Sequence, residues 1–523
     1  MTVSIFNDVI GPVMRGPSSS HCAAALRIGR LARDLMDGDI RQVLVEFDRR
    51  GSLATTHASQ GSDMGLFGGL MGWEATDERL PEAAQAIRNA GIDVRIAIEN
   101  LGYIHPNTYR LTLSNRRERR TLTALSTGGG MIEVVEIDGF AVSVAGDYAE
   151  TLIFVNAGGR EVADRLYDVD QAGEVLVHEA RGGQLVELKG HQFVNDAALA
   201  AIEHHYDVLA VKRLSPVLPV RSRAGLKVPF VTCEAMFRYE GDCDWPLWKL
   251  AAVYESARGG LTEEDVLERM REIVRTLRAS LVQGLEGTDY EDRILGHQCG
   301  RFARHMTDAS LLDAGVLNRI ILYVTALMEV KSAMGVIVAA PTAGACAALP
   351  GAVLGAADAC GFTDDDMAQA MLAGGMIGVF IATGSTFAAE VAGCQAECGA
   401  ASGMAAAALA TLATGSAEQA VAAASMALQN SFGMVCDPVA NRVEVPCLGK
   451  NVMAAANALA CANMALAGYD PVIPLDEVIE AMDKVGRSLP HELRCTALGG
   501  LSITMTSKAI EAKLKQQRRP TDG

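Results

Sequence analysis

The sequence predicts an α+β protein in three parts: an N-terminal α/β domain over residues 1–145, a small middle module over 146–235 and a C-terminal all-α domain over 240–510. Strand-like runs such as 41–54 alternate with helical runs in the first half, whereas apolar residues recur only at helical spacing from about residue 240 onward. The length of 523 residues also exceeds that of a typical single domain.

Composition narrows the class of protein. The net charge of −17 argues against nucleic acid or an anionic membrane as a partner. Twelve cysteines, with no basic and apolar leader pattern at the start, indicate a reducing cytoplasmic location where thiols serve as ligands or packing groups. With 52 glycines and only 5% aromatic residues, we expect closely packed helices.

Two uncharged runs, 332–357 and 370–389, are long enough to span a bilayer. The first contains two prolines, and both are rich in Ala and Gly without flanking Trp or Tyr. We therefore interpret them as buried helices and expect no membrane partner.

The N-terminal part opens with GPSSSH at 16–21, a loop that leads into a helix with apolar residues at helical spacing. Its hydroxyls and free amides suit an anion, although an ordinary helix cap explains them equally well. A strand pattern, a Gly-rich turn at 55–73, an HPNT element at 105–108 and a glycine turn at 126–130 follow.

The middle module reads as strand, helix, hairpin with a Gly182-Gly183 turn, helix and strand. This β–α–β–β–α–β order is typical of small ferredoxin-like folds. The adjacent His204 and His205 are expected on a solvated helix face.

The helical part begins with an acidic first turn after Thr262. His297 and Cys299 follow, and two residues apart on one helix they would not share a face, so we expect packing roles or a local hydrogen bond. A break at Pro341–Gly344 frees backbone amides that can bind a carboxylate at the next helix start.

The stretch 390–451 carries Cys394, Cys436 and Cys447 in loop or helix-start positions, where a thiolate is favoured and can bind a metal. Buried cysteines are also common packing residues, and the spacing alone does not separate the two readings. No CxxC occurs, which excludes a zinc ribbon or ferredoxin pattern.

Five motifs resemble the iron–sulfur-dependent L-serine dehydratase (L-serine ammonia-lyase) family in its single-chain form. They are GPSSSH, PTAGACAALPG at 341–351, GCQAE at 393–397, CDPVANRVEVPC at 436–447 and LRCTALGGL at 493–501. They stand in the family's order and cover most of the chain. The resemblance implies a cytoplasmic lyase of amino-acid degradation and gluconeogenesis, a small amino-acid substrate, a homodimer and no pyridoxal phosphate. It also makes the middle module similar to an ACT regulatory domain.

The resemblance further implies a [4Fe–4S] cluster on Cys394, Cys436 and Cys447. Three ligands leave one iron open to act as a Lewis acid on the substrate hydroxyl, while a base removes the Cα proton. Loss of water and hydrolysis of the enamine then convert L-serine to pyruvate and ammonia. A different β-substituted amino acid, or a non-catalytic amino-acid-binding paralogue, stays open. Cys346 and Cys398 are further thiols near these motifs.

The same resemblance supplies the substrate-binding and catalytic candidates. Substrate binding is expected from Ser18, Ser19, Ser20, Asp63, Asn107, Pro341, Thr342 and Gly344. The catalytic candidates are His21, His57, His105 and Gln60.

One departure concerns the base. Gln60 stands where the family has a histidine, and an amide cannot accept a proton at neutral pH. His57 lies three residues earlier and, on an extended segment, would face the other way. A second departure is the TGST run at 383–386, where the family often has Lys-Asn-Ala-Ser.

Overall fold

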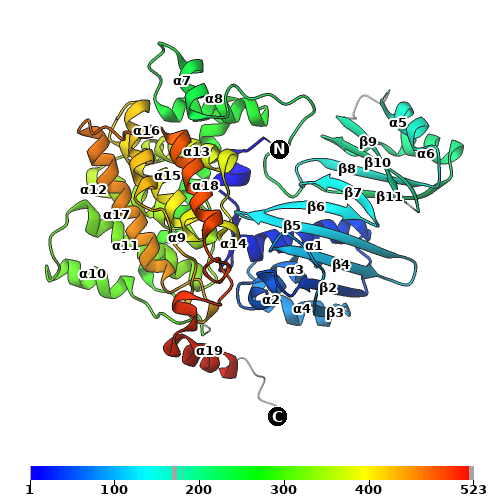
Figure 1. Ribbon diagram of the computed structural model, residues 1–523, viewed down its shortest axis with the longest axis horizontal. Coiled ribbons are helices and arrows are strands. Elements are labelled where there is room, and N and C mark those ends of the chain that lie inside the picture. The colour runs from blue at the N-terminus through cyan, green and yellow to red at the C-terminus, as the bar shows by residue number, and fades with distance from the viewer. Residues whose placement is uncertain (1, 168–172, 181, 292, 518–523) are drawn as a thin grey trace.

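The computed structural model describes residues 2–167, 173–180, 182–291 and 293–517. Figure 1 shows two sheets gathered on one side of the molecule and the helices of the second half on the other. The α+β class predicted from the sequence is confirmed, with sheets in the N-terminal part and helices in the C-terminal part.

The larger sheet has six strands in the order β3-β2-β4-β5-β6-β7, in which only β2 and β3 pair in parallel. In β7, Phe140, Val142 and Val144 are buried and the residues between them are exposed, as expected for a sheet with one solvated face. Helices α1 and α3 pack together, and α1 contacts β5 and β6. The elements are β2 (Gln42–Asp48), β3 (Asp93–Glu99), β4 (Thr108–Ser114), β5 (Arg119–Gly128), β6 (Met131–Ile137), β7 (Phe140–Val144), α1 (Ala24–Leu35), α2 (Leu53–Thr56), α3 (Ser62–Leu70) and α4 (Ala83–Asn89).

The smaller sheet is antiparallel, with strand order β11-β8-β10-β9. In the sequence, one helix follows β8 and a second follows β10. Ile153, Val186 and Ile202 belong to its separate hydrophobic core. The predicted β–α–β–β–α–β succession is present, whereas the likeness to an ACT domain stays a prediction. The elements are β8 (Ala149–Val155), α5 (Gly159–Tyr167), β9 (Glu174–Ala180), β10 (Gly183–Gly190), α6 (Asp196–His205) and β11 (Val208–Leu214).

Residues 2–15 form an N-terminal arm that packs on the helical half of the molecule. The short strand β1 (Val13–Met14) pairs with β12 (Ile337–Val338). Ser4 Oγ donates to Glu255 Oε1 at 2.5 Å, and the Ile5 amide donates to the other oxygen of Glu255 at 2.8 Å. The arm therefore fixes the segment 16–21 against helices that come more than 200 residues later. The domain boundaries proposed above stay a prediction.

The helical half is held by close packing between small residues. A Cβ added to Gly351 would lie 2.9 Å from the Val324 amide nitrogen, and one added to Gly355 would lie 2.8 Å from Ile320 Cα. Glycine thus lets α11 and α12 approach each other closely. The helices are α7 (Cys233–Glu240), α8 (Leu247–Gly259), α9 (Glu263–Glu286), α10 (Cys299–Thr307), α11 (Val316–Ser332), α12 (Ala348–Cys360), α13 (Asp364–Gly384), α14 (Ala389–Ala392), α15 (Cys398–Leu412), α16 (Ala417–Gln429), α17 (Cys447–Leu466), α18 (Leu475–Ser488) and α19 (Met505–Gln517).

Short helical turns connect these elements, and several carry motif residues. They are η1 (Ile5–Val9), η2 (Ser19–Ala23), η3 (Leu80–Glu82), η4 (Ala343–Ala345), η5 (Cys394–Ala396), η6 (Val439–Asn441), η7 (His491–Leu493) and η8 (Gly500–Ile503). The helix start predicted after Thr262 is confirmed, and the Thr262 hydroxyl caps it by accepting from the Asp265 amide at 3.1 Å.

Two helical stretches, Ala343–Cys360 and Asp364–Gly384, are long and apolar enough to cross a membrane. Within them, 83% and 78% of the residues counted are buried inside the protein. Such burial is what core helices show, which agrees with the interpretation of the two uncharged runs as buried helices.

Candidate active site

The three predicted ligand cysteines come from three different local structures. Cys394 opens η5 directly after Gly393, whose φ of 71° and close approach to the Met434 carbonyl require glycine. The Cys436 amide donates to the Leu493 carbonyl at 2.9 Å, which ties the CDPV segment to the C-terminal motif. Cys447 is the first residue of α17 and follows Pro446.

These cysteines line one buried cavity between residues 16–21, the 53–63 loop and the helical half. Its open volume is about 20 Å³, enough for about one water molecule. Its walls carry thiols, hydroxyls, carboxylates and one ammonium group. They include Ser18, Ser20, Gln60, Gly344, Glu390, Cys394, Glu397, Cys436, Asp437, Cys447, Lys450 and Cys495.

The thiols differ in their readiness to ionise. A hydrogen bond from Cys398 lowers the pKa of Cys394 to about 7. Burial raises the pKa of Cys447 to about 12, and the nearby Cys394 acts in the same direction. For Cys436, a hydrogen bond with Cys495 is the largest cause of a raised pKa. Cys394 is therefore the thiol that most readily supplies a thiolate.

Residues 16–21, called the serine segment below, contribute two side chains to this cavity. Ser18 and Ser20 line it, whereas Ser19 Oγ accepts from the Ala343 amide at 3.2 Å and so joins this segment to the Pro341–Gly344 break. His21 lies fully buried behind them. Its Nδ1 is 3.1 Å from Ser18 Oγ, and its Nε2 is 2.7 Å from Thr56 Oγ1.

Glu390, which lies just before Cys394 in the sequence, contacts the serine segment. Ser20 Oγ donates to Glu390 Oε1 at 2.7 Å, and the same oxygen lies 3.5 Å from His21 Nδ1. Its other oxygen, Oε2, is buried and has no hydrogen-bond partner among the described residues. Sequence reasoning missed Glu390, although it is the only charged residue between Asp366 and Glu397. A lone carboxylate in an apolar run is the signal that could have found it.

The 53–63 loop is helical rather than extended, which corrects the geometry considered for His57 and Gln60. The Gln60 amide donates to the Thr56 carbonyl at 2.9 Å. Gln60 lines the cavity, and its Nε2 lies 2.8 Å from Asn441 Oδ1 and 3.5 Å from Cys495 Sγ. His57 instead pairs with Asp63 at 2.8 Å and lines a separate surface hollow.

The HPNT element lies behind the serine segment. His105 Nδ1 accepts from the Asn107 amide at 3.2 Å, and burial lowers the pKa of His105. The Asn107 side chain is fully buried, and neither of its polar atoms has a partner in the described part of the chain. The Ser126 amide donates to the Asn107 carbonyl, and Ser126 Oγ donates to the Ser20 carbonyl at 2.7 Å.

The Pro341–Gly344 break approaches the cavity through Thr342 and Gly344. Thr342 Oγ1 donates to Glu397 Oε1 at 2.7 Å. A Cβ on Gly344 would lie 2.6 Å from that oxygen, so only glycine leaves room for the carboxyl group. Burial raises the pKa of Glu397 to about 8, which keeps it protonated at neutral pH.

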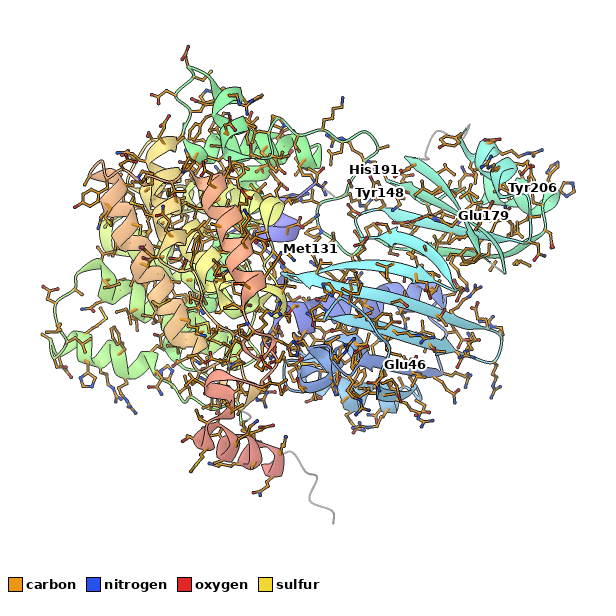
Figure 2. The ribbon with its side chains drawn as sticks, in the orientation of Figure 1. Glu46, Met131, Tyr148, Glu179, His191 and Tyr206 are labelled. Carbon is orange, nitrogen blue, oxygen red and sulfur yellow. The ribbon has the colours of Figure 1, made fainter. Side chains whose placement is uncertain are left out.

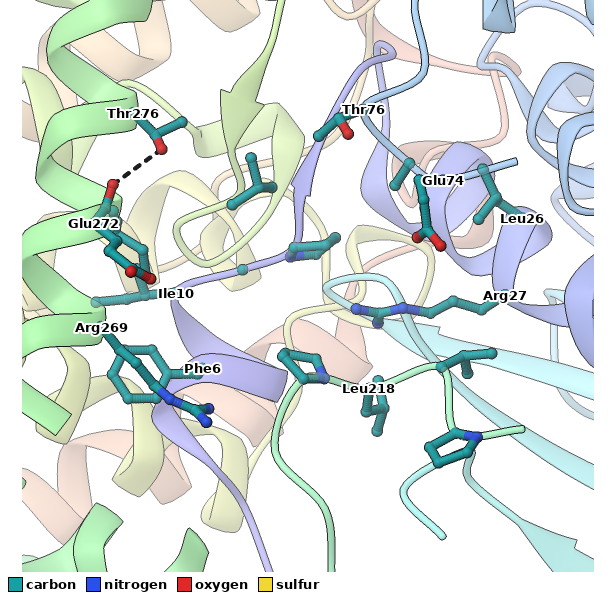
Figure 3. Close-up of a pocket in the computed structure, with 18 of the residues that line it drawn as sticks. Phe6, Ile10, Leu26, Arg27, Glu74, Thr76, Leu218, Arg269, Glu272 and Thr276 are labelled. Atoms are coloured by element: carbon teal, nitrogen blue, oxygen red, sulfur yellow. Dashed lines mark hydrogen bonds between the residues drawn. The ribbon is translucent and has the colours of Figure 1, made fainter. Parts of the chain in front are cut away.

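Other predicted residues lie apart from the cavity walls. Cys346 is buried in the main helical core, and His204 and His205 are exposed on α6. Figure 2 shows Met131, which follows the 126–130 glycine turn, at the junction of the two halves, with Glu46 away from it on the sheet. A second cavity of about 720 Å³ lies between the arm, α9 and residues 216–219 (Figure 3).

A buried cavity that combines ionisable thiols, carboxyl groups and hydroxyls is typical of an enzyme active site. Comparison with known proteins gives the family. The family model described as "Serine dehydratase alpha chain" matches residues 193–502. The chain belongs to the serine dehydratase family and is therefore a lyase.

Individual relatives agree with this assignment. The chain is 38% identical over 253 residues to the probable L-serine dehydratase alpha chain of Bacillus subtilis, covering 48% of this chain and 84% of the relative. The beta chain of the same organism is 41% identical over 153 residues, which are 29% of this chain and 68% of the relative. An L-serine dehydratase of Streptomyces coelicolor is 26% identical over 519 residues, covering 97% and 99% of the two chains. This chain therefore has the single-chain form of the family.

Proposed function

We propose that the chain converts L-serine to pyruvate and ammonia with a [4Fe–4S] cluster held by Cys394, Cys436 and Cys447. The observation that carries the proposal is the meeting of these three cysteines, from distant segments, in the walls of one buried cavity. The relatives named L-serine dehydratase support the substrate.

The donor set fits such a cluster. Three thiols stand on separate segments, and thiolates are the usual ligands of iron–sulfur clusters. Cys394 is hydrogen-bonded to Cys398 and Cys436 to Cys495, so cluster binding would replace these two thiol–thiol hydrogen bonds. When bound, the cluster supplies Lewis acidity that weakens the bond to the substrate's β-hydroxyl.

The substrate carboxylate is assigned to the serine segment and to the Pro341–Gly344 break. Ser18 and Ser20 offer hydroxyls in the cavity wall, and Gly344, in the short turn η4, lines the same cavity. The buried Asn107 amide, whose donor and acceptor atoms have no partner among the described residues, is linked to Ser20 through Ser126 rather than lining the cavity itself.

Glu390 is assigned as the group that accepts the Cα proton. It lines the cavity, and its Oε2 has a free acceptor site within the described structure. The hydrogen bond from Ser20 holds the other oxygen, which fixes the carboxylate orientation. His21 Nδ1 lies near the same carboxylate of Glu390, so the imidazole can exchange a proton with it. Gln60, at the position of the family's histidine, orients neighbouring groups but accepts no proton.

Glu397 is assigned as a proton donor toward the departing hydroxyl, because it stays protonated near neutral pH and lines the same cavity. Lys450 Nζ donates to the Val435 carbonyl at 2.6 Å and to Asp437 at 2.9 Å. Its fixed positive charge stabilises thiolates in the wall.

Gln60 favours a second candidate, in which the same site acts on a different β-substituted amino acid. An effector role for the ACT-like middle module, a cytoplasmic location and a homodimer also remain proposals. The fold alone is compatible with a non-catalytic amino-acid-binding paralogue.

The test uses protein purified without oxygen. We expect pyruvate and ammonia in equal amounts from L-serine, and loss of both iron and activity in Cys394→Ser. Cys360→Ser, at an exposed thiol on α12, is the matched control. A panel of L-amino acids with hydroxyl, thiol or chloro groups at Cβ identifies the substrate. Iron-loaded protein inactive on the whole panel would refute the catalytic proposal.

A further inference from the structure

A second group of metal-binding side chains lies outside the cysteine cavity, at the start of α10. His297, Cys299 and Glu329 place their ligand atoms within 4.8 Å of one another. His297 Nδ1 is 3.0 Å from Glu329 Oε2 and 3.6 Å from Cys299 Sγ. The expectation that one helix would turn His297 and Cys299 apart is wrong, because α10 begins only at Cys299 and His297 precedes it. The alternative expectation of a local hydrogen bond between them is confirmed.

The local fold holds all three side chains in place. Glu329 Oε1 accepts from the backbone amides of Gln298 and Cys299, which leaves Oε2 directed at His297. A Cβ on Gly300 would lie 2.3 Å from His297 Nε2, so the imidazole rests against bare backbone. Cys299 and Glu329 are buried, and the His297 side chain is 32% exposed.

We propose that His297, Cys299 and Glu329 bind one Zn²⁺ ion, with water as the fourth ligand. Thiolate, imidazole and carboxylate together are zinc ligands, whereas Ca²⁺ and Mg²⁺ take oxygen ligands. Donors about 2.0–2.3 Å from a tetrahedral ion lie about 3.3–3.6 Å from one another. The two separations from His297, 3.0 and 3.6 Å, are close to this geometry, and the third pair, Cys299 Sγ and the Glu329 carboxylate, lies within 4.8 Å and closes in around the ion.

Binding is a proton exchange without redox chemistry. Cys299 Sγ now donates to the Gly284 carbonyl at 3.0 Å. The ion replaces that proton, which passes to solvent, and a sulfur–zinc bond forms. The backbone amides on Glu329 act as the outer hydrogen bonds that orient a ligand. The exposed edge of His297 provides the entry path and the position for water.

The site connects to the segment that carries Cys447. Lys331, two residues beyond Glu329 on α11, donates to the Val443 carbonyl. Glu444 accepts from the amides of Ile294 and Leu295, in the segment just before His297. Zinc would therefore brace the segment before α10 against α11 and stabilise the walls of the cysteine cavity without taking part in the reaction.

The alternative is a helix cap without an ion, and metal content separates the two. Full-length protein is incubated with Zn²⁺, desalted and analysed for zinc by mass spectrometry. We expect about one zinc per chain in wild type and in His305→Ala, which changes an exposed histidine on α10, and almost none in His297→Ala. Because His297 is partly exposed, its replacement should leave folding intact, which circular dichroism checks.

Cys447→Ser controls for zinc trapped by the cluster cysteines, and it should retain the His297-dependent ion. Cobalt replacement adds a spectroscopic readout, with a thiolate-to-cobalt absorption band in wild type that is lost in Gly300→Ala and Cys299→Ala. Equal zinc content in wild type and His297→Ala, loss of the His297-dependent ion in Cys447→Ser, or absence of zinc from wild type would overturn the proposal. Because metal content is read without substrate, failure here is distinguishable from failure of the proposed reaction.

Discussion

The assignment of Glu390 as proton acceptor makes a direct prediction for Glu390→Gln. Glutamine can keep the oxygen that accepts from Ser20 Oγ, a contact of 2.7 Å. It places an NH₂ group where Oε2 now accepts no hydrogen bond from any residue that the structure describes. The substitution therefore removes proton acceptance while it preserves the shape of the site and the hydrogen bond to the serine segment.

The magnitude follows from that chemistry. A positioned general base contributes about 10²- to 10⁴-fold to the rate, which is about 3–5 kcal/mol of the activation barrier. We expect kcat to fall by this factor. KM should change by less than about threefold, because the contact to Ser20 is retained. Iron content should stay at the wild-type level, since Glu390 is not a proposed ligand.

The assay measures pyruvate formation from L-serine without oxygen, with rates normalised to iron. Glu418→Gln, at an exposed position on α16, is the matched control and should behave as wild type. A kcat for Glu390→Gln within about threefold of wild type, at equal iron content, would refute Glu390 as the base. Lost iron in the variant would instead reassign Glu390 to a structural role.

Three further predictions test the surroundings of the site. Gly344→Ala should lower activity at least about tenfold with the fold retained, because the new methyl group meets Glu397 at 2.6 Å; wild-type activity would contradict this. His57→Ala, outside the cavity walls, should keep kcat within about threefold, and a loss of about 10²-fold or more would restore His57 as the base. Burial raises the pKa of Glu255 from 4.5 to about 7, so its contribution to stability is full below pH 4.5, falls by about 3 kcal/mol as the pH rises to 7, and is flat above. Because Glu397 titrates over the same range in both proteins, denaturant unfolding of Glu255→Gln should show a fall between pH 4.5 and 7 that is smaller than that of wild type by about 3 kcal/mol, whereas equal pH profiles would contradict it.

Much of the fold could be predicted because its signals are local. The strand at 42–48, the hairpin turn at Gly183 and the helix start after Thr262 each depend on a few neighbouring residues. The docking of the N-terminal arm depends on Ser4 meeting Glu255, 251 positions apart, and no local pattern indicates that pairing.

The candidate site likewise has one part that local sequence motifs predict and another part that depends on contacts between distant segments. Cysteines, serines and Gln60 stand in recognisable motifs, and the structure brings Ser18, Ser20 and Gln60 to the same cavity as Cys394 and the other thiols.

Glu390 and Glu397 were missed because a carboxylate gains its role from burial and from partners on other segments. Similarly, a helix running through both His297 and Cys299 would place them on different faces. Because α10 begins only at Cys299, both side chains reach Glu329.

The central claim is that Cys394, Cys436 and Cys447 together hold one cluster. The most direct measurement is iron and sulfide content of each Cys→Ser variant after anaerobic reconstitution, beside wild type and Cys360→Ser. We predict about four irons per chain in wild type and the control, and loss of most iron in each of the three variants. Full iron content in any one of the three would contradict the account.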